Sequence, residues 1–372
     1  MRSAALVVVL VLAAARPAEG YPQFQLATGA ARCNQCHYAP AGGGLINGYG
    51  RDEAADSISM GGNGDFLHGV WELPSWLGLG GDLRAAGLVN NVGATDGAEL
   101  TAFPMQADLY ARVAVEAFSL YVSAGITGAV RPEADFVDRL VSREHYLMWR
   151  PKSVGPYLRV GRFFAPYGLR LAEHLSFVRR FLGFNTLEET YNLSGGVVND
   201  GWELHATAFT PDPFRPVGFE GSGGAVYYER RFGETFAAAA QARFAIASGD
   251  TRTQGGLVGK LYLEPARTLL LVQTDLVHER FDETGASRLQ WVYYLGASWR
   301  FARGFMVQLM LERWDPDLAT RGVARDALDL EVQWFPTAHV EVSLFGRLQL
   351  IGPGSDDSTG AQVLMLQAHY YL

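Results

Sequence analysis

Two cysteines and a histidine lie close enough in the sequence to act on one cofactor. Cys33 and Cys36 are the only cysteines in the 372-residue chain, and His37 follows them directly. Two thiols at this spacing can form thioether bonds with the two vinyl groups of one haem, and the next side chain is then placed to ligate the iron from one face. The spacing therefore predicts one covalently bound haem c on Cys33 and Cys36, with His37 as an axial iron ligand.

Two alternatives use the same cysteines. A zinc site would need two further ligands, and the chain has no third cysteine to supply one. A disulfide between Cys33 and Cys36 is the second alternative, but it gives no role to His37 or to the small residues at 39–44, A-P-A-G-G-G. Small residues let the backbone lie flat against a porphyrin. The haem interpretation is the one that accounts for all of these features.

The second axial ligand has several candidates. Met60 and His68 are the only other methionine and histidine between the cysteines and the first predicted strand. Either side chain can ligate haem iron, and histidine gives a lower potential than methionine. If this segment plugs a barrel, His205 and His369 become candidates as well. For Met60 and His68 an ordinary packing role is the alternative.

The N-terminus predicts export from the cytoplasm. Arg2 gives a positive start, residues 4–15 form an apolar run, and small residues stand at Ala18 and Gly20, where a signal peptidase reads them. Cleavage after Gly20 leaves a mature chain that begins at residue 21, and a cut after Ala15 fits the same rule. The apolar run has 12 residues, fewer than the about 20 that a bilayer-crossing helix needs.

From about residue 78 onward, apolar and polar residues alternate with a period of two, as on β-strands. Leu328, Leu330 and Val332, for example, alternate with Asp329 and Glu331. We find sixteen such segments, at 79–90, 102–116, 117–130, 141–151, 154–164, 188–198, 201–211, 222–232, 234–247, 254–264, 267–281, 287–301, 304–315, 326–336, 338–351 and 361–372.

The connections between these segments alternate in length. They are tight after even-numbered segments, as at 199–200 and 302–303, and longer and polar after odd-numbered ones, as at 211–222 and 314–325. Outer-membrane barrels have short periplasmic turns and long external loops, and they close because an open edge in lipid leaves backbone groups unpaired. We therefore predict an all-β fold, a transmembrane β-barrel of about sixteen antiparallel strands. A large soluble β-sandwich or propeller is the alternative.

The polar faces of these strands are expected to line the lumen. They carry charges of both signs, which indicates no clear charge selectivity. The inward residues are Gln106, Asp108, Tyr110, Arg112, Arg159, Glu203, His205, Gln241, Arg243, Lys260, Asp329, Glu331, Glu341, Arg347 and His369.

Two parts of the chain resemble known families. Residues 33–37 resemble the haem-attachment segment of c-type cytochromes, without the helices and Met-Pro signature of the soluble class I members. The strand region resembles porin-like bacterial outer-membrane barrels, although its last strand ends in Leu372 where that family usually has Phe. The apolar loop at 164–187 is similar in position and composition to the third external loop of general porins, which narrows the pore. Packing over the barrel mouth is the alternative for this loop.

The resemblance implies three regions and an outer-membrane location. They are a signal peptide at 1–20, a monohaem c-type cytochrome segment at 21–77, on the periplasmic side or as a lumen plug, and an outer-membrane barrel at 78–372. The leading hypothesis is electron transfer at or across the outer membrane, with the barrel as anchor or sheath. One haem cannot span about 30 Å of hydrocarbon, so periplasmic or extracellular cytochromes are expected partners, beside the outer-membrane lipid.

Other functions fit the sequence less well. The alternative is a porin-like solute channel whose haem segment acts as plug or sensor. A peroxidase would need an open iron position and a distal acid-base pair, and the sequence shows no such constellation, so we do not expect an enzyme. A net charge of -8 disfavours a nucleic-acid partner, which requires a basic face.

Overall fold

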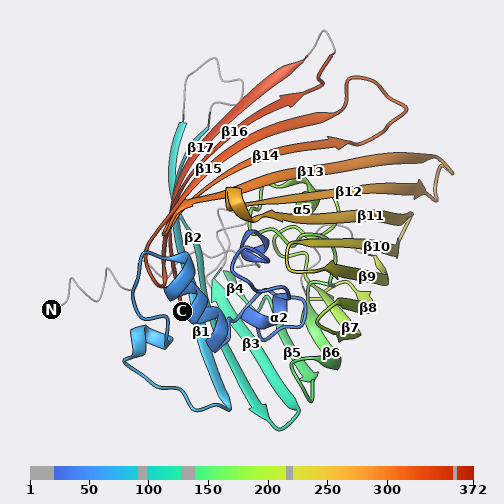
Figure 1. The fold of residues 1–372 in the computed structure, drawn as a ribbon. Coiled ribbons are helices and arrows are strands. Elements are labelled where there is room, and N and C mark those ends of the chain that lie inside the picture. Colours follow the sequence, from blue (N-terminus) through green and yellow to red (C-terminus); the bar gives the residue numbers. More distant parts are fainter. Residues whose placement is uncertain (1–20, 91–98, 127–138, 215–220, 355–357) are drawn as a thin grey trace.

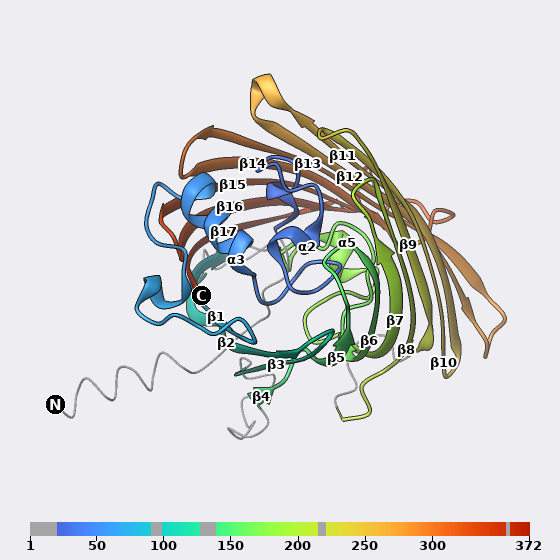
Figure 2. The same cartoon turned by 60° about the horizontal axis from the view of Figure 1, so that its bottom comes forward.

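One antiparallel β-sheet curves round and closes on itself to form a barrel (Figure 1, Figure 2). The computed structural model describes residues 21–90, 99–126, 139–214, 221–354 and 358–372. The strands are β1 (Leu77–Asn90), β2 (Glu99–Val115), β3 (Phe118–Ile126), β4 (Leu140–Val141), β5 (His145–Trp149), β6 (Gly155–Phe163), β7 (Thr190–Val198), β8 (Trp202–Thr210), β9 (Ser222–Phe232), β10 (Phe236–Ala247), β11 (Asp250–Leu263), β12 (Thr268–Phe281), β13 (Ser287–Ala302), β14 (Phe305–Asp315), β15 (Arg325–Thr337), β16 (Val340–Ile351) and β17 (Thr359–Tyr371).

The barrel closes where the first strand meets the last. β1 pairs with β17 from Asp82 opposite Tyr371 to Asn90 opposite Val363, and β1 also pairs with β2. β4 and β5 both pair with β3, so within the described residues they share one of sixteen positions around the wall. The predicted sixteen-stranded barrel is confirmed. The predicted single strand at 141–151 is instead two strands, β4 and β5, because residues 142–144 do not adopt strand structure.

The two faces of the wall differ as the alternation predicts. On β15, Asp329 and Glu331 are buried on the lumen side, whereas Leu330 and Trp334 are exposed on the outer surface. The other predicted lumen residues are also buried, except Arg112, which is half-buried. An outer face of this kind suits lipid, and the inner face can hold water or protein.

Short turns gather at one end of the barrel, which we call the short-turn end. They include the connections at 233–235, 303–304 and 338–339. One connection at the opposite end is tighter than the sequence predicts, because β10 passes to β11 through Ser248 and Gly249 alone. Gly249 adopts a φ of 80°, which a residue without a Cβ reaches at little cost. The predicted leader at 1–20 and the predicted end of the third strand at 127–130 lie outside the described residues.

The apolar loop at 164–187, called the constriction loop, folds into the lumen. It contains α5 (Phe177–Arg180), which contacts β13 and β14. Lumen side chains bind its backbone: the Gly168 N–H donates to Gln241 at 2.6 Å, and the Leu169 N–H donates to Gln273 at 2.8 Å. Leu171, Phe177 and Leu182 join the main buried apolar cluster, so the predicted constriction is confirmed in its position.

The chain before β1 forms two arms on either side of the barrel rim. The inner arm, residues 21–58, lies inside the barrel and contains η1 (Pro22–Phe24), α2 (Cys33–Cys36), α3 (Gly48–Glu53) and η2 (Ala54–Ile58) (Figure 2). The rim segment, residues 60–76, contains η3 (Phe66–Gly69) and leads into β1. Among the described residues, no helix is long and apolar enough to span a membrane.

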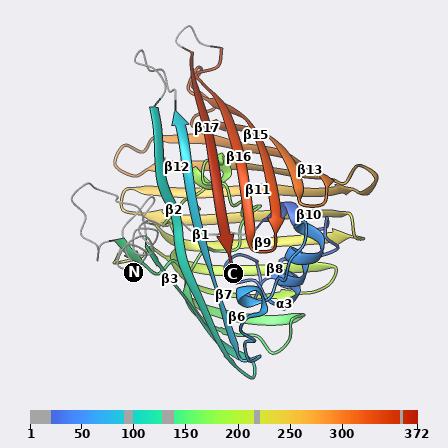
Figure 3. The ribbon, with the colours of Figure 1, turned by 90° about the vertical axis from the view of Figure 1, so that its left-hand side faces the viewer.

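The inner arm occupies the short-turn end of the lumen (Figure 3). Ile58 accepts a hydrogen bond from the Gly304 N–H at 3.1 Å, and Ala55 accepts one from Arg303 at 3.0 Å; both donors lie in the turn between β13 and β14. The Asn34 side chain donates to the carbonyl of Ser153, in the turn between β5 and β6. These bonds attach the inner arm to opposite parts of the wall.

Candidate cofactor site in the barrel lumen

The two cysteines lie on one helical turn that is held by the next helix. The backbone N–H of Arg32 donates to the Gln35 side chain at 2.8 Å, which closes the first turn of α2. Asn47 caps α3 by accepting from the Gly50 N–H, and its own N–H donates to the carbonyl of Cys36 at 2.8 Å. This arrangement fixes both cysteine side chains and the following His37 in a single region of the inner arm.

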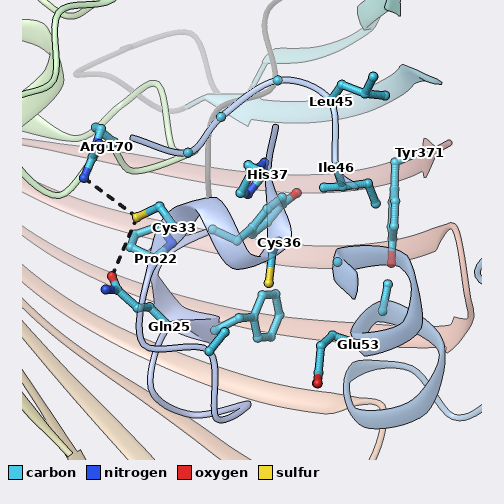
Figure 4. A pocket seen from close by; sticks show the side chains of 18 of the residues that line it. Pro22, Gln25, Cys33, Cys36, His37, Leu45, Ile46, Glu53, Arg170 and Tyr371 are labelled. Atoms are coloured by element: carbon cyan, nitrogen blue, oxygen red, sulfur yellow. Dashed lines mark hydrogen bonds between the residues drawn. The ribbon is translucent and has the colours of Figure 1, made fainter. Parts of the chain in front are cut away.

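All three residues line one cavity between the inner arm and the wall (Figure 4). The cavity has a volume of about 1520 Å³, part of which is open to solvent. Its lining is mainly apolar and comes from the inner arm, the constriction loop and several strands. The lining residues that sequence reasoning did not single out include Tyr21, Pro22, Phe24, Leu45, Arg170, Phe335 and Tyr371.

The environment keeps these three groups uncharged. Cys33 and Cys36 are free thiols, and burial raises the pKa of both, that of Cys36 to about 12. Burial lowers the pKa of the His37 imidazole to about 4. A neutral imidazole keeps a lone pair, which is the form that ligates a metal. The His37 Nδ1 atom is enclosed with no hydrogen-bond partner among the described residues.

Gly42 leaves space directly against the cysteine and the histidine. A Cβ at this position would lie 3.0 Å from the Cys33 Cβ and 3.7 Å from the His37 Cδ2. Gly42 also has a φ of 82°, a conformation that residues with side chains rarely adopt. A flat group can therefore approach Cys33 and His37 along the backbone of residues 39–44. This is the run of small residues that the sequence predicts to lie against a porphyrin.

Charged and polar groups from the constriction loop, the inner arm and the wall hold the cysteine side of the cavity. Arg170, from the constriction loop, donates to the Cys33 sulfur at 3.8 Å, and the thiol donates to Gln25 at 4.0 Å (Figure 4). Lys260 donates to Gln25 at 2.7 Å and forms an ion pair with Glu229 at 2.7 Å. A buried ion pair with an additional hydrogen bond fixes geometry firmly, since neither charge has water as an alternative.

The structure does not bring the proposed second ligands Met60 and His68 to this cavity. Both belong to the rim segment and lie outside the cavity lining. Met60 is 52 % exposed, and its sulfur accepts a hydrogen bond from Trp334. The reason is tertiary: the chain leaves the lumen at residue 59 and crosses the rim before either residue is reached. Their expected role as iron ligands is therefore not supported by their positions.

Of the two lumen histidines considered, His369 lines the cavity and His205 does not. His369 contacts a carboxylate at each nitrogen, with Nε2 2.6 Å from Asp82 and Nδ1 3.1 Å from Glu341. Both nitrogens of His369 therefore already have partners within the protein, and the ring of Tyr21 stacks beside it with 6.5 Å between the ring centroids.

The cavity fits a covalently attached haem on the evidence of its donors. It offers two free thiols on one helical turn, an enclosed neutral imidazole and a glycine that leaves room for a planar group. Arg170 and Arg159 also line it, and guanidinium groups suit carboxylates such as haem propionates. No group of three or more metal-ligating side chains occurs among the described residues.

Comparison with known proteins identifies the class of fold. No protein-family model matches the sequence, and no curated protein sequence matches it. Solved structures do match. An anion-selective porin from Comamonas acidovorans has a TM-score of 0.63 at 12% identity and covers 80% of this chain and 99% of its own.

Two other solved structures show the same architecture. The loop L8 deletion mutant of OmpT, an outer membrane protein of Vibrio cholerae, has a TM-score of 0.60 at 13% identity, with coverage of 80% of this chain and 99% of that one. The outer membrane channel DcaP of Acinetobacter baumannii has a TM-score of 0.59 at 11% identity and covers 80% and 97%. Identities this low show the fold alone: the chain has the closed barrel of bacterial outer-membrane porins.

Proposed function

We propose that this protein carries one c-type haem in the lumen of an outer-membrane barrel and transfers electrons at that membrane. The observation that supports the proposal is the convergence of Cys33, Cys36 and His37 on one enclosed cavity. When bound, the haem supplies one-electron redox chemistry. In this proposal Cys33 and Cys36 would hold the group covalently, and His37 would ligate its iron.

The surrounding residues position and shield the site. Gln25 and Arg170 hold the Cys33 side, and Gly42 leaves the approach free. The apolar side chains of Phe24, Leu169 and Phe335 reduce the access of water to the cavity. A low dielectric strengthens the effect of each nearby charge on a bound redox centre. The protein thus supplies attachment, orientation and a controlled electrostatic environment.

The position of the site suggests how partners reach it. It lies at the short-turn end, which in outer-membrane barrels faces the periplasm. The hydrocarbon core is about 30 Å thick, so a single haem at one end does not connect both sides. We infer that soluble or membrane-bound cytochromes exchange electrons with this end, and that the barrel anchors and encloses the carrier.

A porin-like solute channel is the second candidate. The fold shared with porins and the DcaP channel favours it, as does a lumen wall with charges of both signs. The inner arm and the constriction loop cover much of that wall, and lumen residues such as Glu203 and His205 are fully buried. In this alternative the inner arm acts as a plug or sensor.

Visible spectra of outer-membrane fractions, recorded with and without reductant, test the first proposal. We expect a haem spectrum that changes reversibly on reduction. We also expect the haem to stay attached to the polypeptide during denaturing electrophoresis. A colourless protein that conducts ions in planar bilayers would contradict it and favour the channel. A coloured protein with little conductance would exclude the channel as the main function.

A further inference from the structure

The rim segment gathers exposed apolar side chains beside the start of the barrel. Val70 is 85 % exposed, Trp76 is 53 % exposed and Trp71 is 51 % exposed. Met60 and Leu67 add further exposed apolar surface. An apolar group of this size on one short segment indicates a contact surface, since water disfavours it.

The contacts of the rim segment with the strands are made on the lipid-facing side of the wall. Met60 accepts from the indole of Trp334 at 3.4 Å, and His68 lies at hydrogen-bond distance, 3.2 Å, from the Tyr370 hydroxyl. Trp334 shares its face of β15 with exposed Leu330, and Tyr370 shares its face of β17 with exposed Leu366. The rim segment therefore lies outside the barrel, next to the surface that meets lipid.

The turn between β15 and β16 fixes the backbone of the rim segment. The Ala338 N–H donates to the carbonyl of Gly61 at 2.8 Å, and His339 contacts the carbonyl of Asp65 at 3.1 Å. Leu67 and His68 both adopt left-handed backbone conformations, with φ of 51° and 58°. Non-glycine residues take this conformation rarely and need surrounding contacts to keep it. The exposed side chains are therefore held in place on an ordered support.

Aromatic residues of the strands surround the same end of the barrel. Trp299, Phe301 and Trp334 are exposed on the outer surface close to the short turns. Outer-membrane barrels carry such aromatic girdles at the level of the lipid headgroups. Trp76 precedes β1 directly and extends this girdle onto the rim segment.

We propose that the rim segment inserts into the headgroup region of the phospholipid leaflet around the short-turn end. Val70, Trp71 and Trp76 contact the boundary between headgroups and acyl chains, while Asp65 and Glu72 face water. The segment thereby attaches the outer part of the N-terminal region to the membrane. Through this attachment it also holds the inner arm at the barrel mouth. This inference depends on the barrel crossing a lipid bilayer and not on the haem.

Spin labels at single introduced cysteines test the proposal in phosphatidylcholine–phosphatidylglycerol vesicles. Val70→Cys reports the rim segment, Leu366→Cys reports the lipid-facing wall, and Glu234→Cys reports the exposed turn between β9 and β10. We expect collisions with oxygen to exceed collisions with a water-soluble nickel chelate at residues 70 and 366, and the reverse at residue 234. If the label at residue 70 behaves like the one at residue 234, the proposal is wrong.

The labelling itself separates this inference from the proposed function. In denaturant, wild-type protein takes up no label if Cys33 and Cys36 are bound to haem, whereas free thiols would react. In the second case the same three substitutions are made in a Cys33→Ser, Cys36→Ser background. The relation between residues 70, 366 and 234 then still decides whether the rim segment contacts lipid.

Discussion

The two arms of the N-terminal region follow one another in sequence but lie in opposite environments. The inner arm is surrounded by lumen side chains, and its backbone and polar groups are bonded to charged residues such as Lys260, Arg300 and Arg303. The rim segment contacts the outer face of the wall and exposes Val70 and Trp71. The crossing point is Ser59, whose side chain is fully buried.

This contrast shows which residues can contribute side chains to the same site. Residues a short distance apart in sequence, such as His37 and Met60, are separated by the barrel rim. Residues far apart, such as Cys33 and Arg170, meet in the lumen. The inner arm therefore holds the candidate cofactor site, and the rim segment has a separate role.

The largest effect is expected from Cys36→Ala in the inner arm. It removes one of the two thiols proposed to hold the haem, so the expected covalent haem staining on denaturing gels should be lost. The barrel has its own wall and pairing, so it should still migrate in its heat-modifiable form. Met60→Ala is the matched control and should keep the stain. Loss of the folded barrel in Cys36→Ala would contradict the separation of the inner arm from the wall.

The next effect concerns the constriction loop, which covers the lumen on the other side of the cavity. Replacing Leu171, Phe177, Val178 and Leu182 by serine removes apolar side chains that are at least 95 % buried. Each such truncation costs about 2 to 5 kcal/mol, so the loop should leave the lumen and single-channel conductance should rise several-fold. Arg180→Ser, on an exposed part of the loop, is the control. Unchanged conductance would show that the inner arm alone closes the barrel.

A moderate loss of stability is expected for Lys260→Met, which disconnects the inner arm from the wall. The substitution leaves Glu229 without one of its buried partners and removes the closer of the two donors to the Gln25 side-chain oxygen. Breaking a buried ion pair costs about 3 kcal/mol, and thermal unfolding followed by gel mobility should reveal it. Lys152, the other lysine, is exposed, so Lys152→Met should leave the unfolding temperature unchanged. Equal unfolding temperatures of the two variants would contradict a stabilising connection between the inner arm and the wall through Lys260.

The smallest effect is expected when both rim-segment candidates are removed. Met60→Ala combined with His68→Ala should leave the visible spectrum and the reduction potential of the proposed haem unchanged, because neither side chain lines the cavity. His37→Ala is the positive comparison and should alter the spectrum. A spectral shift in the double variant would mean that the rim segment reaches the cofactor after all.

The barrel could be predicted from sequence because its pattern is local. Each strand repeats the same alternation of apolar and polar residues, as in Leu330 between Asp329 and Glu331. The length of each connection indicates the end of the barrel at which it lies. The break at 142–144 is marked in the sequence only by the consecutive polar residues Ser142, Arg143 and Glu144, which interrupt the alternation without indicating how the chain is bonded there. The physical cause is tertiary, since the backbone there bonds across the sheet: the Ser123 N–H donates to the carbonyl of Glu144 and the Glu144 N–H donates to the Ser123 hydroxyl.

The site could be predicted only as far as its motif extends. Cys33, Cys36 and His37 are neighbours, so their meeting at one cavity follows from spacing. The contributions of Arg170, Phe335 and Tyr371 depend on how the loop and the barrel close around the inner arm. The direction taken by the chain after Ser59 depends on contacts with Trp334 and Tyr370, which no pattern around residues 60–68 reveals.

The pairing of β1 with β17 has a consequence for the order of maturation. Asp82 of β1 and His369 of β17 both line the cavity, so the junction between the first and last strands is also a wall of the candidate cofactor site. Cys33 is covered from the other side by the loop that carries Arg170. If the thiols carry a haem, the attachment machinery has to reach them while the polypeptide is still open, before the barrel is sealed.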